Sequence, residues 1–339
     1  MSRVEPQPGV DGQPGRGDPT LRQLAPEHRL RRLELLVTRR LDGLLHGQHL
    51  GLLPGPGSEY TGAREYRAGE DEVRRMDWAV TARTTLPHVR ELDADRELST
   101  WLLVDSTPSM DFGTAELEKR ELAVAAVAAV GFLTAGVGNR LGAHLLDAGG
   151  VRRYPARSGR AHLLGLLGAL LAAPRGDVGG TPPSLAEAVT ALHRANPKRG
   201  LAVIVSDFLD GLPDGEDGTP DWERAIRRLA VRHQVLAVEV VDPRELELPD
   251  IGLVTLVDPE TGRRREVSTG DRGLRERYAV AAAEQRELVR QALRRTGAAH
   301  LSLRTDRDWT ADVVRHVHTQ RRLAGATRAP RTAVRGGAA

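Results

Sequence analysis

The sequence contains no cysteine, and this absence removes several kinds of chemistry at once. Disulfide bonds, thiolate zinc sites, iron–sulfur clusters and cysteine nucleophiles are all excluded for this chain. Aromatic residues make up only 3% of the sequence, so the stacking platforms that single-stranded nucleic acids need are scarce. The remaining candidate ligands are mainly the oxygen atoms of carboxylates and hydroxyls.

Long apolar runs are also missing. No stretch reaches the roughly 18 to 20 apolar residues that cross a bilayer, and the nearest one, residues 122–137, is short and rich in Ala and Gly. The first twenty residues lack the apolar centre of a signal peptide. We therefore expect a soluble, cytoplasmic protein without a membrane span.

Lysine is nearly absent, because Lys119 and Lys198 are the only two and every other basic residue except histidine is arginine. The 49 basic and 46 acidic residues give a net charge of +3. Six of the arginines follow Asp312, where no acid is present, so the rest of the chain is slightly acidic. This distribution does not indicate a nucleic-acid surface.

Composition divides the chain into five segments. Two terminal segments have the composition of disordered tails: residues 1–20, and residues 324–339, which contain arginines. A polar segment, residues 48–98, is expected to form short strands or functional loops. Residues 21–47 are predicted to contain an amphipathic helix with the apolar stripe Leu30, Leu33, Val37, Leu41 and Leu44. This helix is either a brace against the main domain or a membrane-surface helix.

Residues 99–323 alternate between strand and helix patterns and are predicted to form the main domain. We expect strands at 101–105, 141–148, 151–157, 201–207, 234–242 and 299–305, and helices at 118–137, 161–173, 184–194, 222–232, 271–295 and 310–323. Residues 253–267 have the pattern of an inserted β-hairpin. The rhythm predicts an α/β fold with a doubly wound, mostly parallel sheet covered on both faces.

Candidate ligand-binding residues follow the predicted first strand. In open parallel sheets, ligands bind beyond the carboxyl ends of the strands, near the point where the strand order reverses. Asp105, Thr107 and Ser109 occupy alternate positions of the loop that begins there, so their side chains can converge on one point. Such a hard, all-oxygen set suits Mg²⁺.

The same style of ending recurs later in the chain. The strand 201–206 leads into Asp207, and Gly179-Gly180-Thr181 lies between the two strands, just before a helix. This order resembles the metal-ion-dependent adhesion site of von Willebrand factor A domains. The resemblance implies a fold of that type and one divalent ion held by Asp105, Thr107, Ser109, Thr181 and Asp207, with a coordination position open for a partner's acidic side chain. The simpler alternative is a set of helix caps and turns.

The segment before the first strand carries a second resemblance. Five short motifs of this segment are Gly57-Ser58-Glu59-Tyr60, Arg64-Glu65-Tyr66, Ala68-Gly69-Glu70-Asp71, Arg74-Arg75-Met76-Asp77-Trp78 and Thr81-Ala82-Arg83. Together they resemble a sequence block of domain-of-unknown-function family 58. In that family the block precedes a von Willebrand factor A-like domain. The signature residues are Glu59, Tyr60, Arg64, Tyr66, Asp71, Arg74, Asp77, Trp78, Arg83 and Glu91. They are expected to form either a recognition surface or a self-satisfied lid, with an Arg–carboxylate network and with Tyr66 and Trp78 as buried anchors.

The family resemblance implies a protein-binding adaptor that works with a MoxR-type AAA+ ATPase to assemble or activate other proteins. The chain itself has no G-x-x-x-x-G-K-[ST] phosphate loop, no G-x-S-x-G elbow and no H-E-x-x-H pair, so no enzyme activity is expected. His316 and His318 are expected to be surface residues. Two alternatives remain: a metal-dependent hydrolase using Asp210 or Asp147 as general base, and a metal-free scaffold.

Overall fold

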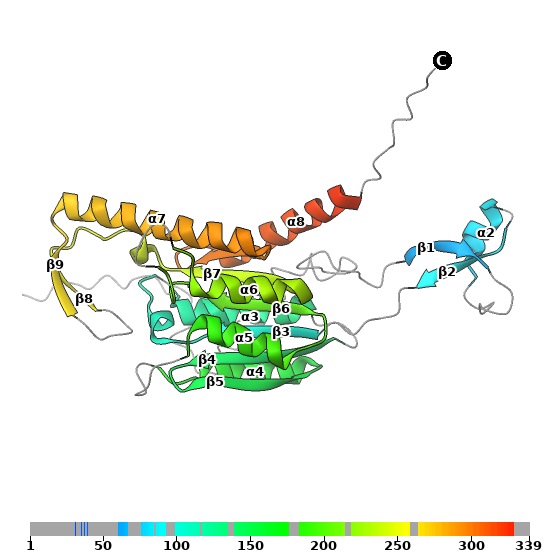
Figure 1. The fold of residues 1–339 in the computed structure, drawn as a ribbon, viewed down its shortest axis with the longest axis horizontal. Helices are drawn as coiled ribbons and strands as arrows, with labels where there is room; N and C mark the ends of the chain where they lie inside the picture. The colour runs from blue at the N-terminus through cyan, green and yellow to red at the C-terminus, as the bar shows by residue number, and fades with distance from the viewer. Residues whose placement is uncertain are drawn as a thin grey trace, which may run out of the picture.

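The computed structural model describes residues 60–66, 76–84, 86–92, 99–115, 117–134, 139–175, 183–213, 218–257 and 264–328, together with Arg31, Leu35, Val37 and Arg39. In this part of the chain, a six-stranded sheet with helices on both faces forms the main body (Figure 1).

The central sheet confirms the predicted fold class. Its strands are β3 (Ser99–Asp105), β4 (Arg140–Asp147), β5 (Gly150–Arg157), β6 (Leu201–Ser206), β7 (Gln234–Val241) and β10 (Ala299–Arg304). Their order is β10-β7-β6-β3-β4-β5, and only the β4–β5 pair is antiparallel. Because β4 lies on one side of β3 and β6 on the other, the strand order reverses at β3.

Side-chain alternation along the strands builds a separate core on each face of the sheet. Leu102 and Val104 of β3 belong to one buried cluster, and Leu103 belongs to the other. The first cluster contains residues of α3 (Lys119–Thr134), α4 (Arg160–Leu171) and α8 (Trp309–Arg328). The second contains residues of α5 (Leu185–Ala195), α6 (Asp221–Arg232) and α7 (Arg272–Thr296). This two-sided burial explains the continuous apolar runs of the central strands.

The helix near the N-terminus contributes to the first of these clusters. Val37 is helical and fully buried in the cluster with Leu102, whereas Arg31, Leu35 and Arg39 are exposed. Burial of Val37 in the protein core supports a brace rather than a helix lying on a membrane. The other predicted stripe residues lie outside the described residues.

The polar segment forms a small unit rather than an extension of the main sheet. β1 (Tyr60–Glu65) and β2 (His88–Leu92) make their own antiparallel pair, and α2 (Trp78–Thr84) lies between them in the sequence. The prediction that Trp78 is a buried anchor is wrong, because its side chain is 64% exposed. Trp78 opens a seven-residue helix that buries none of its residues, so nothing covers the ring among the described residues. Tyr66 is only partly buried.

Two further boundaries are clear. The predicted hairpin is present as β8 (Leu253–Val257) paired with β9 (Arg264–Ser268), although its turn lies outside the described residues. The expected tail from residue 324 is wrong at its start, since α8 continues through Leu323 to Arg328.

Among the helices of the described residues, none combines the length and apolarity needed to span a membrane.

Gly142 of β4 is predicted to be essential for packing against β3. A Cβ atom at this position would lie 2.3 Å from Cζ3 of the Trp101 ring. Gly142→Ala should therefore destabilise the protein by about 1–3 kcal/mol through overpacking. Gly165→Ala in α4 is the matched control, because a Cβ added there would meet no atom within 4 Å and alanine favours the helix. Equal urea midpoints for the two variants would contradict this prediction.

Candidate functional site

The candidate site lies at the carboxyl edge of the central sheet, where β3 and β6 end side by side. Asp105 is the last residue of β3, Ser206 is the last residue of β6, and Asp207 follows it directly. Asp105 and Asp207 are only 2% and 1% exposed, whereas Thr107 and Ser109 are partly exposed. The structure therefore places four of the predicted site residues at the strand-order reversal, where open α/β sheets bind their ligands.

The loop after β3 is organised around the Asp105 carboxylate. Its Oδ1 accepts hydrogen bonds from the Thr107 N–H at 2.9 Å and from the Thr107 hydroxyl at 2.7 Å. Its Oδ2 accepts one from the Ser206 hydroxyl at 2.7 Å. The Thr107 and Ser109 hydroxyl oxygens are 3.3 Å apart. The alternate spacing of these residues thus brings the two hydroxyls together.

Asp207 is held by groups from two other segments. The Lys119 ammonium at the start of α3 donates to Asp207 Oδ2 at 2.7 Å, and the Leu209 N–H donates to Oδ1 at 3.1 Å. The Ser109 hydroxyl also hydrogen-bonds to Asp207, which joins the two strand ends. Burial acts to raise the pKa of Asp207, but the charge of Lys119 outweighs it and holds the pKa below its usual range. Asp207 is therefore an ionised carboxylate with a built-in counter-ion.

Asp105 has the opposite electrostatic character. Burial, and then the nearby charge of Asp207, raise the pKa of Asp105 to about 6, against the hydrogen bonds from Ser206 and Thr107. Its hydrogen-bond partners in the described part of the chain are all neutral groups. The two carboxylates at this edge therefore differ: the charge of Asp207 is balanced by Lys119, whereas Asp105 pairs with no such cation among the described residues and resists ionisation.

The residue after Asp207 has an unusual backbone conformation. Phe208 has a φ of 57°, in the left-handed region that bulky side chains rarely adopt. Its buried ring packs edge-on against Trp222 at a centroid distance of 5.3 Å, and its N–H donates to the Ser206 hydroxyl. Core packing and the Ser206 hydrogen bond therefore stabilise a strained turn directly after Asp207, at the carboxyl edge of the sheet.

Sequence reasoning did not identify the charged network behind Asp207. Lys119 also forms an ion pair with Glu245, which follows β7. Arg286 of α7 binds Glu245 Oε2 at 2.7 Å, Glu239 Oε1 at 3.2 Å and the Asp207 carbonyl oxygen at 3.0 Å. The rarity of lysine was a signal for Lys119, but nothing local marked Arg286.

The donor set fits a hard cation in type, because Asp105, Thr107, Ser109 and Asp207 offer only oxygen atoms. Its charge is low, since Lys119 offsets that of Asp207. Within the described ranges, no three carboxylate or imidazole side chains gather at one point, so the hydroxyls would be required as ligands. Thr181, the fifth predicted ligand, lies outside the described residues.

The two bases named for a hydrolase both make contacts within the fold. Asp210 Oδ2 accepts the N–H of Leu185 at 2.6 Å and so caps the start of α5. Asp147 accepts the Gly149 N–H and forms an ion pair with Arg152 at 2.6 Å. Asp242, at the end of β7, binds Thr114 and Thr305 and thereby ties neighbouring loops together.

The signature residues are only partly described. Asp77 is buried, and its Oδ1 accepts the N–H groups of Ala79 and Val80, so it caps α2. Arg83 is exposed and donates to the Ala79 carbonyl oxygen. Glu59, Asp71 and Arg74 lie outside the described residues, as do the side chains of Tyr60, Arg64 and Glu91. The predicted Arg–carboxylate network therefore stays a prediction.

The two histidines of α8 differ from each other. His318 is exposed, as expected, but His316 is partly buried, and burial lowers its pKa.

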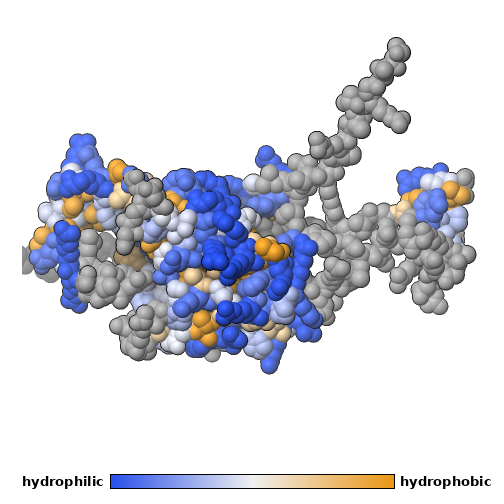
Figure 2. All heavy atoms as spheres, viewed as in Figure 1, coloured by the Kyte–Doolittle hydropathy of each residue, from blue (hydrophilic) through white to orange (hydrophobic). Residues whose placement is uncertain are grey.

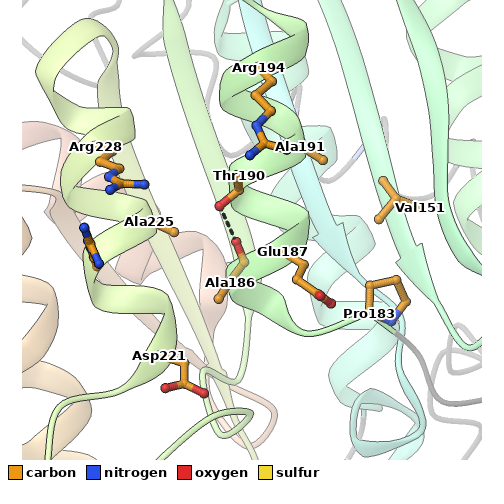
Figure 3. Close-up of a pocket in the computed structure, with 11 residues that line it drawn as sticks. Val151, Pro183, Ala186, Glu187, Thr190, Ala191, Arg194, Asp221, Ala225 and Arg228 are labelled. Carbon is orange, nitrogen blue, oxygen red and sulfur yellow. Dashed lines mark hydrogen bonds between the residues drawn. The ribbon is translucent and has the colours of Figure 1, made fainter.

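A groove of about 770 Å³ runs between α5 and α6 (Figure 3). Both helices begin at the carboxyl edge, because Asp210 caps α5 and the Asp221 N–H bonds to the Gly211 carbonyl oxygen. Small and charged side chains both line the groove, and Figure 3 shows Arg194 and Arg228 on its two walls and Glu187 and Asp221 nearer the starts of the two helices. The face in Figure 2 is mainly hydrophilic, with hydrophobic residues in small groups. A partner that binds this face would therefore make mainly charged and polar contacts.

Comparison with known proteins gives a family match and several relatives. The family model "Protein of unknown function DUF58" matches residues 62–288. Uncharacterized proteins of Mycobacterium tuberculosis and Mycobacterium bovis are 54% identical over 298 residues, covering 87% of this chain and 90% of theirs.

Two solved structures show distant similarity. A conserved hypothetical protein BatB from Bacteroides thetaiotaomicron has a TM-score of 0.39 and 15% identity, covering 68% of this chain and 99% of that one. A von Willebrand factor type A structure from Catenulispora acidiphila has a TM-score of 0.36 and 13% identity, covering 69% of this chain and 43% of that one.

Proposed function

This chain belongs to the DUF58 family, and we propose that it acts as a protein-binding adaptor whose contact site is the carboxyl edge around Asp105 and Asp207. The observation that carries the proposal is the meeting of two buried carboxylates at the strand-order reversal, under two partly exposed hydroxyls. Buried carboxylates are costly, and here they end adjacent strands where open α/β sheets bind ligands.

We further propose that a divalent ion, Mg²⁺ in the first instance, binds at this edge. Asp105, Thr107, Ser109 and Asp207 would hold it, with Thr181 as the fifth ligand implied by the adhesion-site resemblance. When bound, the ion supplies a coordination position for a carboxylate of the partner. The chain's own role is to hold the ion's ligands in place on a rigid sheet edge. The Ser206 hydroxyl positions Asp105, and the turn at Phe208 positions Asp207.

The groove between α5 and α6 supports an acidic partner segment. It starts at the same edge, where Glu187 and Asp221 are the two acids of its lining. The other charged residues of the lining are Arg194, Arg224 and Arg228, which form no ion pairs among the described residues. A segment that places one carboxylate at the edge could lay further acids along these guanidinium groups. The proposed partners are a MoxR-type AAA+ ATPase, as the family resemblance implies, and a protein target that the pair assembles or activates.

The adaptor proposal is tested by capture of a co-expressed MoxR-type ATPase on the tagged full-length chain. We expect capture in Mg²⁺, loss in chelator, and loss of at least about tenfold in Asp105→Ala and Ser109→Ala. Asp147→Ala is the matched control, because Asp147 ends the neighbouring strand β4 but binds Arg152.

Two results would contradict parts of this proposal. Capture that persists in chelator but is lost in Asp105→Ala would indicate a metal-free scaffold. Capture unaffected by both chelator and Asp105→Ala would remove the edge as the contact site.

A further inference from the structure

We propose that Lys119 is a tethered cation that competes with a divalent ion for Asp207 and so sets how tightly the edge binds metal. This inference rests on the proposed function in one respect, the presence of a metal site at this edge. It adds a residue that opposes binding, where the adhesion-site resemblance names only ligands.

The position of Lys119 places its charge directly on a proposed ligand. Its side chain is fully buried, and its Nζ lies 2.7 Å from Asp207 Oδ2. The Lys119 N–H donates to the Phe112 carbonyl oxygen, which anchors the start of α3 against the loop after β3. An ammonium group and a divalent ion that use the same carboxylate repel each other strongly at such distances. Lys119 must therefore weaken metal binding for as long as it stays on Asp207.

Glu245 gives the ammonium a second place to bind. Glu245 forms an ion pair with Lys119 and is itself held by Arg286 and by the Asp242 N–H. When the ammonium leaves Asp207, it therefore keeps a carboxylate partner inside the protein. Arg286 reaches Asp207 only through the main-chain carbonyl oxygen, so it does not occupy the carboxylate. Release of Asp207 thus requires movement of one flexible side chain.

The choice of lysine fits this role. Almost every other basic residue of the chain is arginine, yet a lysine stands at this buried position. An arginine fork binds a carboxylate through two fixed donors, whereas an ammonium is a compact charge on a flexible stem. A counter-ion that can be displaced from its carboxylate is therefore better supplied by the lysine ammonium than by an arginine guanidinium.

The wild-type protein allows a direct test, because Lys119 and exposed Lys198 are the only lysines. Selective isotope labelling of lysine gives two side-chain signals by NMR, and Mg²⁺ is added while calorimetry follows binding. We expect the Lys119 signal to shift in step with binding and the Lys198 signal to stay unchanged. Binding with no change at Lys119 would overturn the inference, and so would no binding of Mg²⁺ or Mn²⁺ by any form of the protein.

A variant tests the size of the effect. Lys119→Met combined with Glu245→Gln removes the ammonium together with the second carboxylate that it pairs with, and Lys198→Met is the control. We expect the double variant to bind Mn²⁺ about tenfold more tightly than wild type, or better, and the control to match wild type. Equal or weaker binding by a folded double variant would overturn the inference.

Failure of the adaptor proposal has a different signature. The double variant would still gain metal affinity, but ATPase capture by the wild type would not depend on Mg²⁺ or on Asp105.

Discussion

Asp105→Asn is expected to stabilise the metal-free protein by about 3 kcal/mol near pH 7.5. The pKa of Asp105 rises from its ordinary 3.8 to about 6, because burial and the charge of Asp207 disfavour its ionised form. Each pKa unit corresponds to about 1.4 kcal/mol of free energy. Asparagine keeps an oxygen that can accept from Thr107 and an amide that can donate to Ser206, but it carries no buried charge.

The pH dependence has a definite sign. Between about pH 4 and pH 6, the folded protein retains the Asp105 proton that the unfolded chain has released. The Asp105 contribution to stability is therefore present at low pH and is lost as the pH rises through about 6. Urea unfolding in chelator should show that the stability gap between Asp105→Asn and wild type opens over this range and is flat above it.

The same variant is expected to lose Mg²⁺-dependent ATPase capture, because it removes a negatively charged ligand. A stabilised but inactive variant is the behaviour expected of a residue kept for binding rather than for folding. If Asp105→Asn is no more stable than wild type at pH 7.5, or if the gap does not change with pH, the electrostatic account of the edge is wrong.

Arg286→Met is expected to destabilise the protein by about 3–5 kcal/mol, the usual cost of breaking a buried ion pair from one side. The buried Arg286 guanidinium binds Glu239, Glu245 and the Asp207 carbonyl oxygen. Without it, Glu239 keeps His300 and Glu245 keeps Lys119, so one buried and one partly buried carboxylate remain with too little positive charge.

Arg290→Met, one turn along α7, is the matched control. Arg290 is 48% exposed and pairs with Glu287 on the helix surface, so its loss should cost about 0–1 kcal/mol. Denaturant unfolding of both variants at neutral pH measures the difference. Similar losses would show that the Arg286 network contributes no more than a surface ion pair.

Much of the fold could be predicted from the sequence, because its signals are local. The apolar run 101–104 and the run 201–205 are strands since they are buried on both faces. Ser184 and Glu187 form the capping box that begins α5, where the sequence predicted a helix from residue 184. Asp105, Thr107 and Ser109 meet because two-residue spacing in one short loop is enough to bring them together.

The remaining features depend on contacts between distant parts of the chain. Lys119 and Asp207 are 88 residues apart, and Arg286 and Glu239 are 47 apart. Trp78 looked like a buried anchor because large aromatic side chains usually pack inside, but its exposure depends on whether another element covers it.

The sequence by itself determined the α/β alternation, the two strand-end aspartates and the oxygen chemistry of the edge, because each follows from neighbouring residues. Only the tertiary structure decided that Asp207 is paired with Lys119 while Asp105 resists ionisation. That distinction arises where β3, β6 and α3 meet, since the charge on a buried carboxylate depends on the cations that the fold brings to it.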